Sequence, residues 1–246
     1  MRIGIVSDIH SNFEALRAVC WDMRRQRVKI VYCLGDVVGY GPFPEKCLKI
    51  IKKISSRIIL GNHDDCACCQ VGIERRLNDL ALEGIKYSIE KLSLSDVDFF
   101  KKLPLQATIK DFDLSLAHAS FSNPAGWDYV DSPQKATEEL KKTPTRICVI
   151  GHTHVSYVFG NKEGLYNELP EKLVLDPEQK FLINVGSVGQ PRDGDCRASY
   201  GILDYAEDGA VFFYLRQVFY NIEKTKEAMK KNGLPPFLYE RLFRGE

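Results

Sequence analysis

All five histidines of the chain lie in short polar motifs that follow apolar runs. Imidazole and carboxylate groups together form the usual ligand set of borderline divalent cations. One histidine in such a place is more often a structural residue, but five in the same setting favour metal binding. The motifs are Asp8-Ile9-His10, Gly61-Asn62-His63-Asp64, Leu116-Ala117-His118-Ala119 and Gly151-His152-Thr153-His154, with Gly35-Asp36 as a companion that lacks histidine.

The apolar runs before these motifs read as β-strands. They cover residues 3–6, 30–34, 58–60, 114–117 and 147–150, and helical patterns separate several of them. Strands that alternate with helices favour an α/β fold with parallel strands. Ser11-Asn12-Phe13-Glu14 fits a capping box before a helix that reaches Met23, and Pro44 suits the first turn of another helix.

The rest of the chain predicts further helices over residues 74–91, 95–103 and 222–231. Strand-like segments cover residues 155–159, 181–185, 199–205 and 210–214, with Asp208-Gly209 as a hairpin turn. We expect these last strands to form a second, more antiparallel sheet. The predicted fold class is α/β, with two packed β-sheets of mixed parallel and antiparallel strands flanked by helices (an α/β/β/α sandwich). No linker divides the chain, so we expect a single domain over residues 1–246.

The bulk properties exclude several classes of protein. The 246 residues carry a formal net charge of +1, which gives no long-range attraction for nucleic acid or an anionic membrane. No apolar stretch approaches the ~18 residues of a membrane span, and the N-terminus lacks a signal-peptide pattern. We therefore expect a cytoplasmic protein without a membrane segment.

The eight cysteines do not form an evident disulfide framework. Cys20, Cys33, Cys47 and Cys148 lie in apolar runs, where a reduced thiol acts as a small hydrophobic group. Cys66, Cys68 and Cys69 form a cluster that could bind a soft metal or respond to oxidants. The cluster lacks a second pair at zinc-finger spacing, which disfavours a structural zinc site.

The polar motifs are expected to meet in space. In open α/β sheets, ligands collect beyond the carboxyl ends of the strands, and each motif follows its own predicted strand. The set exceeds the three or four ligands of one ion, which suggests two divalent ions about 3.5–4 Å apart with Asp36 as the bridge. Such a pair lowers the pKa of a shared water and gives a bridging hydroxide nucleophile near neutral pH. The converging residues are Asp8, His10, Asp36, Asn62, His63, His118, His152 and His154.

The five motifs, in this order between residues 8 and 154, resemble the blocks of the calcineurin-like metallophosphoesterases. The resemblance implies that one ion is held by Asp8, His10, Asp36 and His154, and the other by Asp36, Asn62, His118 and His152. It also implies that His63 contacts the phosphoryl group, together with Asn62, and protonates the leaving oxygen. Manganese, iron, zinc and nickel all suit these ligands.

The chain departs from the protein phosphatases of this superfamily at one place. Those enzymes usually carry a second aspartate three residues after the one that matches Asp36, followed by an arginine, whereas this chain has Gly39-Tyr40. The departure leaves the orientation of His63 unexplained and disfavours a phosphoprotein substrate.

Residues 35–42 and 184–195 resemble instead the compact prokaryotic phosphodiesterase-like branch of the superfamily. In the second segment, Gly186 and Gly189 would permit a close backbone approach. Arg192 could bind a substrate phosphate, or it could form an ion pair with Asp193 or Asp195.

The leading hypothesis is a dinuclear-metal-dependent phosphoesterase that hydrolyses phosphate monoesters or diesters. Its substrate would be a small phosphoester or a nucleotide, and His63 and Asp36 would be the catalytic residues. The alternative is a non-catalytic metal-binding scaffold on the same fold. Nucleic acid is a less favoured target, because no basic stretch interleaved with aromatic residues is present. The choice between monoester and diester, the metal and the oligomeric state stay open at this point.

Overall fold

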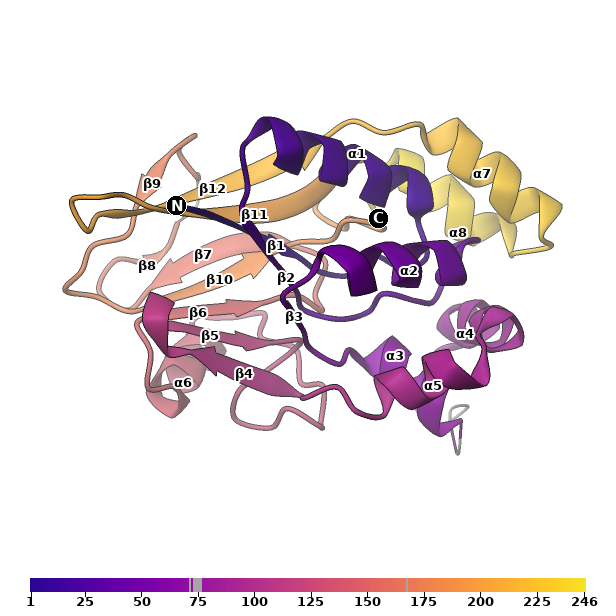
Figure 1. The fold of residues 1–246 in the computed structure, drawn as a ribbon, viewed down its shortest axis with the longest axis horizontal. Coiled ribbons are helices and arrows are strands. Elements are labelled where there is room, and N and C mark those ends of the chain that lie inside the picture. The colour runs from indigo at the N-terminus through magenta and orange to yellow at the C-terminus, as the bar shows by residue number, and fades with distance from the viewer. Residues whose placement is uncertain (71, 73–76, 167) are drawn as a thin grey trace.

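Two six-stranded sheets lie face to face in the computed structural model, which describes residues 1–70, 72, 77–166 and 168–246 (Figure 1). The first sheet has the order β3 (Arg57–Ile58), β2 (Ile30–Cys33), β1 (Arg2–Val6), β11 (Ala198–Tyr205), β12 (Val211–Val218), β9 (Leu173–Val174). The second has the order β4 (Gln106–Ile109), β5 (Leu114–Ala117), β6 (Ile147–Ile150), β10 (Phe181–Val185), β7 (Ser156–Gly160), β8 (Gly164–Leu165). The predicted α/β class with two mixed, packed sheets is confirmed.

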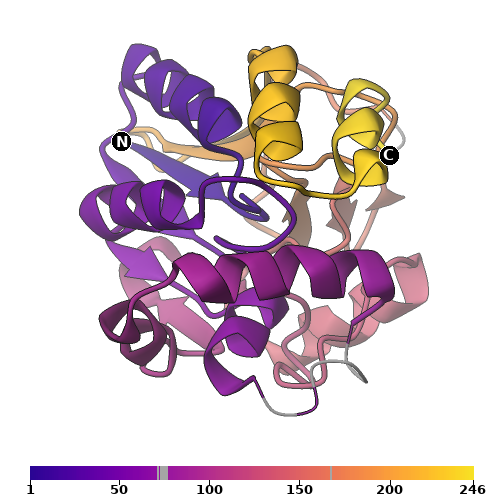
Figure 2. The same ribbon diagram turned by 90° about the vertical axis from the view of Figure 1, so that its right-hand side faces the viewer.

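Helices cover the outer faces of both sheets. Helices α1 (Phe13–Arg25) and α2 (Pro44–Ile54) lie over the first sheet, and α6 (Pro133–Lys142) lies over the second (Figure 1). The remaining helices gather at one end of the sheets, where Figure 2 shows them from the front. They are α3 (Asn62–Cys69), α4 (Asp79–Lys91), α5 (Leu94–Phe100), α7 (Ile222–Lys231) and α8 (Pro236–Glu240). Short 3-10 turns lie between β4 and β5, at Lys110–Phe112, and after α8, at Arg241–Phe243. Within the described ranges, no helix has the length and apolar character needed to cross a bilayer.

Strand β6 explains why several strands read as continuous apolar runs. Its residues are all buried, because Ile147 and Val149 pack between the two sheets while Cys148 and Ile150 pack toward α6. Both faces of such a strand are covered, so the alternation of polar and apolar residues disappears. The layered core thus follows directly from the sequence pattern.

The expected grouping of the last strands into one separate sheet is wrong. Strands β11 and β12 extend the first sheet, in which β11 pairs antiparallel with β1. Strands β10 and β7 extend the second sheet, in which β10 pairs parallel with β6. Strands β11 and β10 cover the edges of β1 and β6 that the early strands leave open, and a covered edge offers no unpaired backbone groups.

Several helix boundaries also differ from the prediction. The side chain of Asn12, not Ser11, caps α1 by accepting from the Ala15 amide at 3.2 Å. Asn78 caps α4, so this helix begins at Asp79, and residues 74–76 of the predicted segment lie outside the described residues. Helix α5 ends at Phe100, before the predicted residue 103. The hairpin at Asp208-Gly209 is confirmed as the turn between β11 and β12.

A buried carboxylate fastens α1 to the first sheet. Asp22 accepts hydrogen bonds from the Tyr200 hydroxyl at 2.8 Å and from the Arg216 guanidinium at 3.1 and 3.2 Å. Burial alone would raise the pKa of Asp22, but the hydrogen bonds from Arg216 and Tyr200 outweigh it and lower the pKa. The ionised carboxylate is therefore the form that the folded state prefers.

Replacement of Asp22 by Asn should lower the free energy of unfolding by about 1–3 kcal/mol, because a charged acceptor of buried donors is lost. A depressed pKa contributes stability above the unfolded value near ~3.9 and loses it as the pH falls further. Urea unfolding of both proteins should therefore differ at pH 7 and converge below about pH 4. A difference that stays constant across this range would contradict the ionic role of Asp22.

Candidate metal centre

Six loops, three from each sheet, meet at the carboxyl ends of parallel strands. Strands β1, β2 and β3 run parallel in the first sheet, and β5, β6 and β10 run parallel in the second. The loops after them bring together all seven predicted metal ligands and His63. Six of these ligands are buried, namely Asp8, His10, Asp36, His118, His152 and His154, and Asn62 is half-buried at the start of α3.

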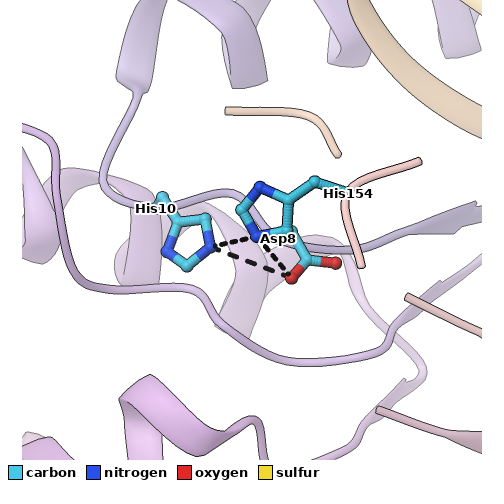
Figure 3. A group of neighbouring side chains, drawn as sticks. All are labelled: Asp8, His10 and His154. Carbon is cyan, nitrogen blue, oxygen red and sulfur yellow. Dashed lines mark hydrogen bonds and ion pairs between the residues drawn. The ribbon is translucent and has the colours of Figure 1, made fainter. Parts of the chain in front are cut away.

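The converging side chains form two groups. Asp8, His10 and His154 make the first group, which Figure 3 shows, and Asp36, His118 and His152 make the second. Within each group the candidate ligand atoms lie within 4.8 Å of one another. A third combination, His10, Asp36 and His63, overlaps both groups. Each group has a ligand set that could hold a divalent metal ion.

Backbone carbonyls fix the tautomers of the histidines. His10 Nδ1 lies 3.1 Å from the Val38 carbonyl oxygen, and His118 Nδ1 lies 2.9 Å from that of Leu34. His154 Nδ1 lies 2.6 Å from the Gln190 carbonyl. A carbonyl only accepts, so each Nδ1 must carry a proton, and a ring that is neutral then presents a lone pair at Nε2. A backbone carbonyl on one ring nitrogen is also the usual support of a metal-binding histidine.

These lone pairs face other acceptors. His10 Nε2 lies 3.0 Å from His154 Nε2, and Asp8 Oδ1 lies 3.2 Å from His154 Nε2 (Figure 3). Burial lowers the pKa of both rings, so both are neutral at pH 7. Among the described residues, Asp8 Oδ1 is a buried oxygen without a hydrogen-bond partner. Acceptors that crowd together without a donor repel one another, and a cation between them would remove the repulsion.

Asp36 lies between the two groups. Its Oδ1 accepts a hydrogen bond from the His63 amide at 2.8 Å. Its Oδ2 lies 3.6 Å from His10 Nε2 and 3.4 Å from His118 Nε2. One oxygen of Asp36 is thus held by the backbone, while the other faces a ligand from each group.

Glycine is needed beside both buried carboxylates. A Cβ at Gly61 would lie 2.1 Å from Asp36 Oδ1, and a Cβ at Gly151 would lie 2.4 Å from Asp8 Oδ2. Asp8 Oδ2 instead accepts from the His152 amide at 2.9 Å. The glycines of the sequence motifs therefore let the backbone approach the carboxylates closely.

His118 shows how strongly the carboxylates attract positive charge. Burial lowers the pKa of its ring, but the charges of Asp36 and Asp8 outweigh burial and raise the pKa to about 9. Its Nε2 lies 3.1 Å from Asn62 Oδ1. A half-buried amide oxygen at this position is a suitable further ligand for a cation.

The backbone at the centre is strained. Asp8, His10, Asp36, His152 and His154 have φ values of 53°, 46°, 50°, 65° and 63°. Residues other than glycine rarely adopt these left-handed conformations, which cost roughly 1–3 kcal/mol each. Strain on five neighbouring ligand candidates indicates that the fold preserves the geometry of this centre at the expense of stability.

Packing, rather than a carboxylate, orients His63. The Tyr40 ring lies 4.7 Å from the His63 ring, and the His10 ring lies 4.7 Å from it on another side. Gly39 has φ +99°, and a Cβ there would lie 2.5 Å from His63 Nδ1. No side chain, and so no aspartate, fits at residue 39 while His63 keeps this position. Burial lowers the pKa of His63 to about 4, which makes the ring neutral at pH 7.

Arg192 faces the centre from the loop after β10. Its Nη2 donates to Gln190 Oε1 at 3.0 Å. Burial is the largest cause of the lowered pKa values of His63 and His154, and the positive charge of Arg192 lowers both values further. Asp195 is paired with Arg197 instead, and the acceptor groups of Asp193 contact Ser156 and the Asp195 amide. Among the described residues, Arg192 therefore does not form the loop ion pair that was the second interpretation of its sequence position.

The segment that follows His63 has a structural role at its start. Asp64 accepts from the amides of Val37 and Val38 at 2.9 and 3.1 Å, which ties α3 to the loop after β2, and from the Gly61 amide at the start of α3 at 3.4 Å. No disulfide joins any of the eight cysteines, all of which lie in the described ranges. Cys68 and Cys69 lie with Asp65 in a further group that could hold an ion, on the surface side of α3.

Some residues at the centre were not predicted from the sequence. Tyr40, Trp127 and Tyr129 surround the histidines, and the Trp127 carbonyl oxygen lies 2.9 Å from His152 Nε2. The position of Tyr40 between two glycines was a weak signal in the sequence. Trp127 and Tyr129 carry no pattern that distinguishes them from other loop residues.

Comparison with known proteins agrees with this geometry. A family model described as the calcineurin-like phosphoesterase superfamily domain matches residues 1–208. An uncharacterised protein of Methanocaldococcus jannaschii is 35% identical over 245 residues, which cover 99% of this chain and 98% of that protein.

Two crystal structures are similar along the whole chain. A metallophosphoesterase from Sphaerobacter thermophilus has a TM-score of 0.85 at 33% identity, with 100% of this chain and 99% of that chain covered. A hypothetical protein from Pyrococcus horikoshii has a TM-score of 0.80 at 19% identity, with 100% and 98% covered, and shows the fold alone. The chain belongs to the calcineurin-like phosphoesterase superfamily.

Proposed function

We propose that the protein is a phosphoesterase that depends on two divalent metal ions and hydrolyses a small phosphate monoester or diester. The observation that carries this proposal is the convergence of the buried atoms His10 Nε2, His154 Nε2, Asp8 Oδ1 and Asp36 Oδ2, of which Asp8 Oδ1 has no hydrogen-bond partner among the described residues. Family membership and the similarity to a metallophosphoesterase support it.

The residues divide naturally into two ligand sets. Asp8, His10, Asp36 and His154 would hold one ion, and Asp36, Asn62, His118 and His152 would hold the other, with Asp36 shared. When bound, such ions supply a nucleophilic water of lowered pKa and neutralise charge on the phosphoryl oxygens. Manganese, iron, zinc and nickel are the candidate metals.

His63, Asn62 and Arg192 would contact the phosphoryl group of the substrate. His63 is neutral, and its Nδ1 has no hydrogen-bond partner among the described residues, so the ring can take part in new hydrogen bonds. Arg192 brings a positive charge to the same side. A charge-assisted hydrogen bond from arginine is well suited to a phosphate oxygen.

Asp36→Asn and His118→Ala should each lose bound metal and at least about 100-fold in kcat/KM, because metal ions contribute several kcal/mol of transition-state stabilisation. Elemental analysis of protein reconstituted with each candidate metal checks the first effect, and chromogenic mono- and diester assays check the second. Asp193→Asn, an exposed aspartate of the neighbouring loop, is the matched control and should keep both properties.

Full turnover by metal-depleted Asp36→Asn would overturn the proposal. A protein that binds two ions tightly but hydrolyses neither kind of ester would favour the non-catalytic scaffold instead. Metal content and activity are therefore measured on the same preparations.

Gly39→Ala should reduce kcat about tenfold or more without loss of metal, because a Cβ displaces the His63 ring. Gly233→Ala is the matched control, since Gly233 also has a positive φ, +74°, but open space around its Cβ position. Equal kcat values for the two variants would show that backbone strain alone, not contact with His63, explains the loss.

Arg192→Ala should raise KM about tenfold or more with metal content unchanged, because a charged hydrogen bond to phosphate contributes about 1.5–3 kcal/mol. Steady-state kinetics check this, with Arg197→Ala as the control, since Arg197 is paired with Asp195. If Arg197→Ala raised KM as much as Arg192→Ala, the contact assigned to Arg192 would be wrong.

A further inference from the structure

A pocket of about 490 Å³ opens beside the candidate metal centre. Asn62, His63 and His152 line its inner end, so a group bound there would adjoin the phosphoryl position assigned above. Three aromatic residues, Tyr40, Trp127 and Tyr129, also line the pocket. Its size is that of a small-molecule site, which is about 300–1,000 Å³ in most proteins.

Two of these aromatic side chains, Trp127 and Tyr129, form a wall of the pocket that contacts the metal-ligand candidates directly. The Tyr129 ring stacks on the His152 ring at 4.3 Å with an interplanar angle of 24°. The Trp127 ring lies edge-on to the His118 ring at 5.9 Å. Any group that lies against this wall is therefore held next to the second group of ligands.

Hydrogen bonds hold the loop that carries Trp127 and Tyr129 in a strained conformation. Trp127 has φ +58°, a left-handed conformation that is costly for a residue with a side chain. Asn123 donates to Asp128 at 3.0 Å, and Lys135 donates to the Tyr129 carbonyl at 2.9 Å. The loop is thus held from both sides in a shape that its sequence does not favour by itself.

Both residues of the wall can make a further contact with a ligand. Tyr129 is 47% exposed although its ring stacks on His152. The indole Nε1 of Trp127 is buried and has no hydrogen-bond partner among the described residues. A buried donor without an acceptor costs free energy unless a bound molecule supplies one.

Apolar side chains also line the pocket. They are those of Leu77, Ala81 and Cys66, and the polar side chain of Asn78 lies among them. Aromatic rings and apolar side chains on one pocket lining offer contacts that suit a flat ring better than a flexible, hydrated chain.

We infer that this pocket binds a planar aromatic portion of the substrate, such as the base of a nucleotide, while the phosphate lies at the metal centre. The assignment of the phosphate position rests on the proposed function. The aromatic subsite, defined as Trp127 and Tyr129, selects among phosphoesters by stacking and by the free indole N–H group.

The test compares two probes that share the same phosphate and sugar, adenosine 5′-monophosphate and ribose 5-phosphate. Calorimetric titration of the metal-loaded protein should give an affinity about tenfold or more higher for the first probe, because stacking of a base on an aromatic side chain contributes roughly 1–3 kcal/mol. Tyr129→Ala and Trp127→Gly should remove most of this preference, so that the affinity for adenosine 5′-monophosphate falls far more than the affinity for ribose 5-phosphate. Trp127→Gly is chosen because glycine tolerates the positive φ.

A second readout locates the base. The chain has two tryptophans, and Trp21 is exposed on α1, away from the pocket, so Trp21→Phe leaves Trp127 as the single tryptophan, which is excited selectively beyond the absorption of tyrosine. Adenosine 5′-monophosphate should quench its fluorescence, whereas ribose 5-phosphate should not. Tyr129→Phe, which keeps the ring, should retain the preference and serves as the matched control.

Equal affinity for the two probes, or a preference that survives both ring deletions, would overturn the inference, and so would the binding of neither probe. These results are distinct from failure of the proposed function. A protein that prefers the nucleotide but hydrolyses no ester keeps the subsite and loses the activity. An active esterase without the preference keeps the activity and loses the subsite.

Discussion

The rest of the structure must hold together a group of buried acceptor atoms that repel one another. These atoms lie at the point where the two sheets meet. Asp8 and Asp36 are fully buried carboxylates whose inward oxygens face the Nε2 atoms of His10, His118 and His154. Such a cluster is unstable unless positive charge lies within it. The raised pKa of His118 is a local sign of this demand. The backbone strain, the supporting carbonyls and the adjacent glycines all act to hold acceptors in a place that they would otherwise leave.

The two-sheet topology makes this arrangement possible. Each sheet contributes three parallel strands whose carboxyl ends open toward the same region, and the antiparallel strands β11 and β7 complete the sheets on their other sides. Helices α3 and α4 then cover the centre from the end shown in Figure 2. Gly84 of α4 packs closely on Tyr40. A Cβ at Gly84 would lie 2.4 Å from the backbone nitrogen of Tyr40. Tyr40 is in this way pressed against His63 and His10.

Much of this could be predicted from the sequence, and the failures have physical causes. The motif residues were predictable because each follows an apolar strand, and parallel strands bring their carboxyl ends together. The sheet membership of β11 and β12 was not, because pairing partners are chosen by edges that only the assembled sheets define. The role of Gly39 depends on a contact with His63 across 24 residues of sequence and is invisible in either motif. Trp127 and Tyr129 belong to a loop whose conformation is imposed by distant partners such as His152, so no local pattern marks them.

The most direct test of the account is anomalous diffraction from crystals of the protein reconstituted with manganese. The account predicts two peaks on either side of Asp36 Oδ2, one beside Asp8, His10 and His154 and the other beside Asn62, His118 and His152. A single peak, or no peak at a manganese concentration that supports hydrolysis, would contradict it.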